Sequence, residues 1–152
     1  MIYLSTISEE EMVSNVVITS KDETLSCLLA ALIADRLGLF YLSFSDLVLY
    51  NANRPSRKAI LSEGGTEWFY KLLHGAAKDL SEYETTSVAI DFDDFDYEVY
   101  LAVRNSSALC YVVTDGDDTD TDGFDVVVRY LGSQQQTANE IAAILTKNPT
   151  RV

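Results

Sequence analysis

The sequence has few cysteines and histidines, the residues that build disulfide bonds and many metal sites. Its 152 residues include two cysteines, two prolines, one histidine and one tryptophan. No Cys-x-x-Cys pair or cysteine–histidine cluster is present, which argues against a zinc site. Cys27 and Cys110 lie in apolar runs. Their setting indicates buried thiols in a reducing compartment rather than a disulfide bond.

Long apolar runs are also missing. No stretch reaches the roughly 18 apolar residues that a membrane span needs. The N-terminal segment lacks a basic region followed by an apolar one, so no signal peptide is expected. We therefore predict a cytoplasmic chain that makes no direct contact with a membrane.

Positive charge is scarce. Lysine and arginine number 11 against 24 aspartates and glutamates, which gives a net charge of −13. This balance disfavours nucleic acid as a direct partner and favours a basic protein surface, a metal ion or simple solubility. The one basic cluster, Arg54, Arg57 and Lys58, is interpreted as a solvated loop rather than a phosphate site. The length predicts one domain over residues 1–152.

Common catalytic motifs are absent: there is no G-x-S-x-G, P-loop, G-x-G-x-x-G or H-E-x-x-H pattern. Residues 118–123 match the start of a calcium-binding EF-hand loop, but Arg129 stands where that loop needs a glutamate. The single His74 falls at a helix edge, which favours a structural role. We predict no catalytic residue, no cofactor and no dedicated metal site. Weak calcium binding, or an enzyme with a carboxylate-bound metal, stays open as an alternative.

What the sequence does contain is a β-rich C-terminal half. Four runs rich in Val, Tyr, Phe and Leu are predicted strands, at residues 86–92, 97–104, 108–115 and 124–131. Short connections between them favour antiparallel neighbours, so the four runs predict a meander.

Three apolar stripes at helical spacing predict helices over residues 20–37, 67–80 and 134–147. Further strands are expected over 13–19 and within 39–50, and short ones at 1–4 and 59–62. The fold class is therefore α+β, with a mainly antiparallel sheet packed by three helices. The expected core comprises Leu29, Leu32, Trp68, Leu72, Val99, Leu101, Val126 and Val128.

The predicted meander has an electrostatic consequence. Eleven acids and two bases fall between residues 86 and 131. Alternate turns of a meander lie at one end of the sheet, so the acidic connections 93–96 and 116–123 come together. Carboxylates beside tyrosine suit an interface with a basic surface. The candidate partner-binding residues are Asp93, Asp94, Asp96, Tyr97, Asp117, Asp118, Asp120 and Asp122.

The size, the acidity and the final segment 126–149 (VVVRYLGS…ANEIAAILTKNP) resemble small immunity proteins of bacterial toxin–immunity systems. The resemblance implies a non-enzymatic cytoplasmic inhibitor that neutralises a basic protein such as a toxin nuclease. Type III secretion chaperones, which are small acidic dimers, are a second similar family. Their usual element order has fewer consecutive strands after the second helix.

Overall fold

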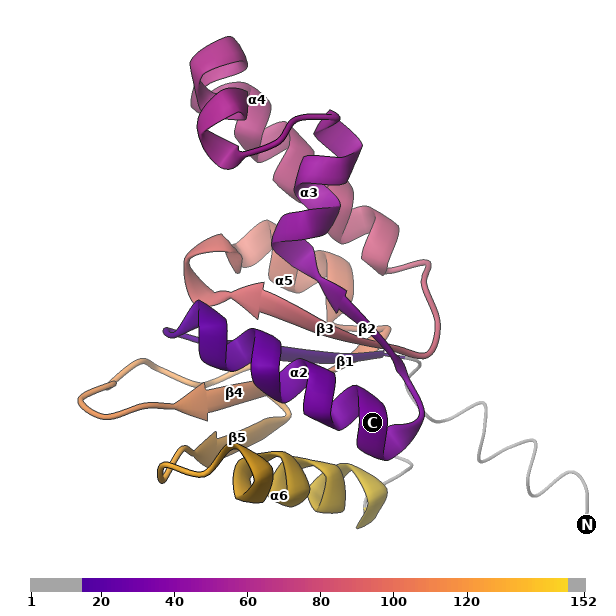
Figure 1. Cartoon of the computed structure of the whole chain (residues 1–152), viewed down its shortest axis with the longest axis vertical. Helices are drawn as coiled ribbons and strands as arrows, with labels where there is room; N and C mark the ends of the chain where they lie inside the picture. Colours follow the sequence, from indigo (N-terminus) through magenta and orange to yellow (C-terminus); the bar gives the residue numbers. More distant parts are fainter. Residues whose placement is uncertain (1–14, 148–152) are drawn as a thin grey trace, which may run out of the picture.

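The computed structural model describes residues 15–147 and contains both strands and helices (Figure 1). The strands are β1 (Asn15–Ser20), β2 (Phe40–Ser43), β3 (Thr86–Asp91), β4 (Ser107–Val113) and β5 (Val126–Arg129). The helices are α2 (Glu23–Leu37), α3 (Phe44–Ala52), α4 (Arg57–Leu80), α5 (Tyr97–Val103) and α6 (Gln134–Lys147), with a short 3₁₀ turn, η1, at Phe92–Asp94. Helices α3 and α4 are consecutive in this range, and no helix lies between β4 and β5. The strand predicted at residues 1–4 and the first two residues of the strand predicted at 13–19 lie outside the described residues.

The five strands form one parallel sheet in the order β2-β3-β1-β4-β5. All six residues of the central strand β1 are buried, because helices cover both faces of the sheet. The fold is therefore α/β. The predicted α+β class, with its antiparallel meander, is wrong.

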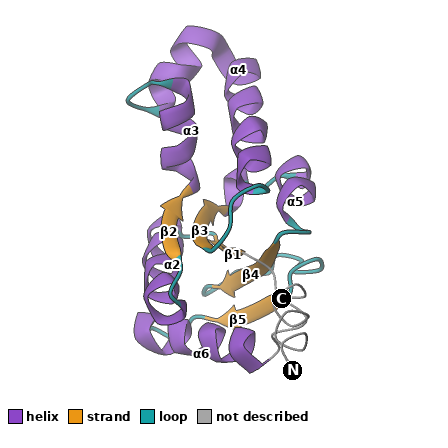
Figure 2. Cartoon of the chain, turned by 90° about the vertical axis from the view of Figure 1, so that its right-hand side faces the viewer, coloured by secondary structure: helices purple, strands orange, loops and turns teal. Residues whose placement is uncertain are grey.

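Two layers of helices enclose the sheet. Helices α2 and α6 pack on one face through residues such as Leu29 and Ile141, against Ile18 of β1. Helices α3, α4 and α5 pack on the other face through residues such as Phe44, Leu73 and Val103. Figure 2 shows α3 and α4 running side by side away from the sheet. We call these two helices, residues 44–80 with their connection, the arm.

The prediction of a meander is wrong at residues 97–104, which form helix α5 rather than a strand. The Asp96 carboxylate caps this helix by accepting a hydrogen bond from the Val99 N–H at 2.9 Å. Val99 and Val103 are both fully buried and stand four residues apart, which is helical spacing. Leu101, which would share their face in a strand, is 38% exposed.

The arm was also misread. Residues 39–50 contain a short strand, β2, followed directly by α3, so the prediction of one bent strand or two over this segment is wrong after Ser43. The predicted strand at 59–62 is the first part of α4. Gly65 interrupts α4 with a φ of 73°, a value that favours glycine and divides the helix into two pieces.

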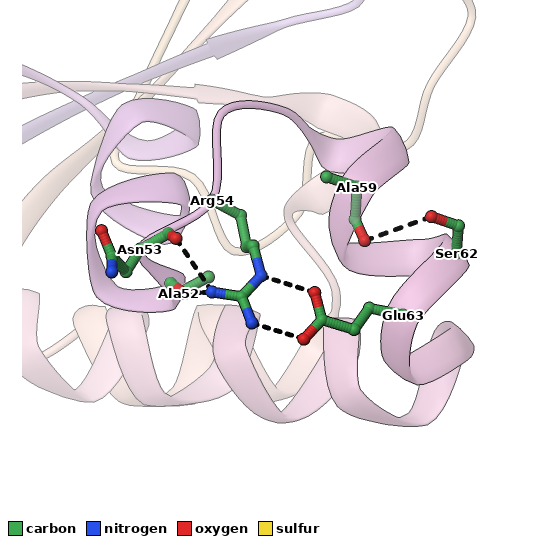
Figure 3. Close-up of polar contacts among 6 residues, drawn as sticks. All are labelled: Ala52, Asn53, Arg54, Ala59, Ser62 and Glu63. Carbon is green, nitrogen blue, oxygen red and sulfur yellow. Dashed lines mark hydrogen bonds and ion pairs between the residues drawn. The ribbon is translucent and has the colours of Figure 1, made fainter.

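Arg54 closes the α3–α4 turn (Figure 3). Its guanidinium donates to the carbonyl oxygens of Ala52 and Asn53 at 3.2 and 3.0 Å. It also forms a bidentate ion pair with the Glu63 carboxylate. The same group lies over the Trp68 ring, 5.5 Å from its centroid. Arg54 is therefore part of the arm's internal bonding, not the solvated cation that the sequence predicted.

The other predictions hold in part. Helix α6 has the bounds expected for it. Helix α2 ends at Leu37 as predicted but begins at Glu23 rather than at residue 20, with Asp22 as its N-terminal cap. Of the predicted core, Leu29, Val99, Val126 and Val128 are buried, whereas Leu32, Trp68 and Leu72 are only partly buried. No helix within residues 15–147 is both long and apolar enough to cross a membrane.

Candidate ligand pocket at the carboxyl edge of the sheet

A crevice opens where two neighbouring strands send the chain to opposite faces of the sheet. Strand β1 leads into α2 on one face, and the neighbouring β3 leads through η1 into α5 on the other. In open parallel sheets, ligands bind beyond the carboxyl ends of strands at such a switch point. The topology therefore places a candidate site beside the ends of β1 and β3.

A pocket of about 340 Å³ lies at this position. Four elements line it: the first turn of α2, the first half of α3, the arm helix α4 and the last residue of β3. The lining residues are Glu23, Ser45, Val48, Leu49, Arg57, Phe69 and Asp91. One wall is apolar, because Val48 and Phe69 are 3% and 7% exposed. The other lining residues include charged and hydroxyl side chains, so the pocket can hold a small molecule with both kinds of surface.

The positively charged residue of the pocket lining, Arg57, already pairs with a carboxylate. The Arg57 guanidinium lies 4.6 Å from the centroid of the Phe69 ring and donates to the Asp94 carboxylate at 2.6 Å. Asp94 itself is buried, with a side chain 5% exposed. Arg57 therefore balances a buried acid beneath the pocket wall.

The remaining charges in the lining are negative. The Ser45 hydroxyl donates to the Glu23 carboxylate at 2.9 Å, which orients that carboxylate. At the end of β3, burial and the negative charges of Glu23, Asp93 and Asp94 raise the pKa of Asp91 above its ordinary value. Burial also raises the pKa of Asp94, although the Arg57 charge acts in the opposite direction. The pocket thus holds carboxylates that repel one another.

The connection between β1 and α2 consists of Lys21 and Asp22 and contains no glycine. Phosphate cradles at this position use a glycine-rich loop whose backbone N–H groups face the ligand. Here the Asp22 side chain accepts from the Leu25 N–H at 3.1 Å, and Glu23 occupies the first helical turn. The N-terminus of α2, which would otherwise attract an anion, therefore carries two carboxylates.

Asp117, in the loop after β4, is held by internal contacts. Its carboxylate accepts from the Tyr111 hydroxyl and from the Thr119 N–H and hydroxyl, and it lies 3.7 Å from Lys21 Nζ. Burial would raise the pKa of Asp117, but the hydrogen bonds from Thr119 and Tyr111 dominate and lower it to about 2. This carboxylate therefore stays ionised and fixes the loop against β4.

The acidic connections 93–96 and 116–123 do lie at one edge of the sheet, because β3 and β4 both run parallel to β1. Within this set, Asp94 pairs with Arg57, and Asp96 both caps α5 and lies 2.8 Å from His74 Nε2. The exposed members are Asp93, Tyr97, Asp118, Asp120 and Asp122. Docking of a basic partner on them stays a prediction.

His74 belongs to this same surface rather than to the pocket. Its ring stacks on Tyr70, and its Nδ1 lies 3.3 Å from Glu98. Within residues 15–147, no group of three or more histidine, cysteine or acidic side chains is arranged to hold a metal ion.

Sequence reasoning missed the pocket. Glu23 was placed in the predicted helix over residues 20–37 with no role in a site, and Arg57 was interpreted as part of a solvated loop. Ser45 lay in a segment read as strand. The one usable signal was Asp91, an acid at the end of a buried strand. It points to a site only once the strand is known to be parallel to β1.

Comparisons with known proteins bear on the fold. No protein-family model matches the sequence, and no curated protein matches it. Among solved structures, shikimate kinase from Acinetobacter baumannii, in complex with shikimate, superposes with a TM-score of 0.76 at 11% identity, covering 93% of this chain and 98% of that one. The chain has the fold of the shikimate kinases.

Two further structures agree. Shikimate kinase from Aquifex aeolicus gives a TM-score of 0.75 at 14% identity, covering 91% of this chain and 99% of that chain. A sugar kinase from Janibacter sp. gives 0.61 at 12% identity, with coverages of 92% and 98%. At these identities the likeness is one of fold.

These likenesses overturn the resemblance to immunity proteins and to secretion chaperones, because more than nine-tenths of the chain superposes on the shikimate kinase fold. The interpretation as a non-enzymatic inhibitor of a basic toxin is therefore wrong. It was based on the size, the acidity and the final segment, where a parallel edge strand and a helix look like the end of an antiparallel α+β domain.

Replacement of Asp91 by asparagine is expected to raise the melting temperature at pH 7. The folded state raises the pKa of this carboxyl, so the folded state binds more protons than the unfolded state, and its stability falls as pH rises through this titration. Asparagine keeps the shape and removes the charge. Calorimetry should show the gain at pH 7 shrinking to nothing below the ordinary Asp pKa of 3.8. Asp35→Asn, an exposed matched control on α2, should change little. A lower melting temperature for Asp91→Asn at pH 7 would contradict the account.

Proposed function

We propose that this chain binds a small organic molecule in the pocket between α2, α3, α4 and the end of β3. The observation that supports the proposal most is the position of the pocket. It lies at the switch point of the sheet, where this class of fold places its ligands, and it combines an apolar wall with oriented polar groups. The arm supplies Arg57 and Phe69, so the ligand would contact both the sheet edge and the arm.

Phosphoryl transfer to the bound molecule is the second candidate function. It is favoured by the likeness in fold to shikimate and sugar kinases over more than nine-tenths of the chain. Because the β1–α2 connection has no glycine, a nucleotide would need phosphate contacts other than a backbone cradle. Lys21, which is 47% exposed beside this connection, is the nearest candidate for such a contact.

We place the chain in the cytoplasm as part of the same proposal. Cys110 is fully buried in β4 and Cys27 is half-buried in α2, and no disulfide bond joins them. Both thiols suit a reducing compartment.

A thermal-shift screen tests the binding proposal. The panel contains shikimate, a hexose, an amino acid and an alkyl amine. At least one compound should raise the melting temperature of the wild type in a saturable way. Ser45→Phe, which places a ring in the pocket, should lose that response. Ser62→Phe, a matched change on the exposed side of α4, should keep it.

Two results would overturn the proposal: no compound shifts the wild type, or Ser45→Phe responds as the wild type does. The same samples with magnesium ATP test the second candidate. Formation of ADP that depends on the bound compound, together with a phosphorylated product in the mass spectrum, would establish phosphoryl transfer. Binding without ADP formation would exclude it for that compound.

A further inference from the structure

The charges of the pocket specify the chemical class of its ligand. Glu23 and Asp91 are both carboxylates of the lining, one from α2 and one from β3. Arg57 is the only basic residue of the lining, and its guanidinium already donates to the buried Asp94. A ligand therefore meets two carboxylates and a cation whose charge is engaged, so the pocket presents net negative charge to it.

The surroundings keep this charge uncompensated. Asp93, in the turn η1 after β3, adds its own negative charge beside Asp91, whereas the charge of Asp94 is balanced by Arg57. On the side of α2, Asp22 and Glu23 occupy the cap and first turn of the helix. An anionic ligand would meet repulsion from both sides, whereas a positive group between Glu23 and Asp91 would relieve it.

The rest of the lining limits the body of the ligand. Val48, Leu49 and Phe69 form an apolar wall, and the Ser45 hydroxyl is engaged by Glu23. A ligand in this pocket therefore meets both apolar side chains and carboxylates. At about 340 Å³ the pocket suits a compact molecule rather than a nucleotide or a peptide.

We infer that the pocket takes a small primary amine, with its ammonium group between Glu23 and Asp91 and a compact apolar body against Val48, Leu49 and Phe69. This inference rests on the proposed function, since it names the ligand class of the same pocket. It differs from the shikimate bound to the Acinetobacter kinase, because shikimate carries a carboxylate and this pocket repels one.

Three probes of the same ring size and different charge test the inference: cyclohexylamine, cyclohexanol and cyclohexanecarboxylate. Calorimetric titration at pH 7.5 should show the amine binding at least tenfold more tightly than either of the others. Asp91→Asn and Glu23→Gln should each weaken amine binding about tenfold. The loss cannot be assigned to unfolding, because Asp91→Asn is expected to melt higher than the wild type.

Matched controls separate a local effect from net charge. Asp35→Asn on α2 and Glu140→Gln on α6 remove the same charge from exposed positions outside the pocket, and both should bind the amine within twofold of the wild type. The inference is overturned if these controls weaken binding as much as the pocket variants do, or if the amine binds no more tightly than the carboxylate.

The outcomes also distinguish the inference from the proposed function. If the alcohol or the carboxylate binds best and Ser45→Phe abolishes that binding, the ligand class is wrong and the pocket is still a ligand site. If none of the three probes binds and the wider panel gives no shift, both fail.

Discussion

Replacement of Asn15 by alanine is expected to lower the free energy of unfolding by about 3 kcal/mol, because it removes four hydrogen bonds, including the acceptor of two buried Thr86 donors. Asn15 is 2% exposed at the start of β1. Its amide nitrogen donates to the carbonyls of Tyr83 and Ser106 at 3.0 and 3.3 Å. Its Oδ1 accepts from the Thr86 N–H and hydroxyl at 3.1 and 2.6 Å. One side chain thus joins the amino ends of β1, β3 and β4.

Urea unfolding of Asn15→Ala and wild type measures this loss. Asn105→Ala is the matched control, because Asn105 is exposed in the turn before β4, and it should stay within about 0.5 kcal/mol of the wild type. A loss below about 1 kcal/mol for Asn15→Ala would show that these hydrogen bonds do not hold the amino edge of the sheet.

Replacement of Ile18 by alanine is expected to cost about 2–5 kcal/mol, the range for truncating a buried isoleucine. Ile18 is fully buried in the central strand β1 and belongs to the core beneath α2 and α6. Since β1 pairs with both β3 and β4, the structure around it has little room to collapse into the cavity. For a chain of this length the loss corresponds to a fall in melting temperature of about 4–20 °C.

Val127→Ala is the control for this truncation. Val127 lies in the edge strand β5 and is 45% exposed, so its loss should cost well under about 1 kcal/mol. Equal losses for Ile18→Ala and Val127→Ala in the same unfolding experiment would mean that β1 is not the centre of the sheet.

The sequence predicted helices α2 and α6 because each has an apolar stripe at helical spacing within a segment of more than ten residues. It failed on α5, which has only seven residues. Val99, Leu101 and Val103 alternate as in a strand, while Val99 and Val103 also fit one face of a helix. In so short a segment the two periods cannot be told apart, and the packing of α5 on α4 and the sheet decides.

The error at α5 also led to the wrong prediction of the sheet topology. A strand at 97–104 made the connection 93–96 short, and a short connection forces antiparallel neighbours. With a helix there, the same residues begin a crossover from β3 to β4. The acidic connections still meet at one edge, because the carboxyl ends of parallel strands share an edge. The expected position was correct, and the topology behind it was wrong.

The pocket could not be predicted, because its lining comes from four elements whose arrangement depends on the parallel topology. Ser45 and Leu49 were placed in a strand, although they belong to α3. Arg57 was placed in solvent, although it pairs with the buried Asp94. The local pattern of apolar and polar residues in the sequence shows neither the crossover that brings α2 beside β3 nor the arm that closes the pocket.

Titration of ¹⁵N-labelled protein with cyclohexylamine, followed by amide chemical shifts, tests the ligand pocket most directly. We expect saturable shifts at Glu23, Ser45, Leu49 and Asp91, with α6 amides unchanged. Shifts confined to the acidic loop 116–123, or spread evenly over the exposed carboxylates, would contradict the account.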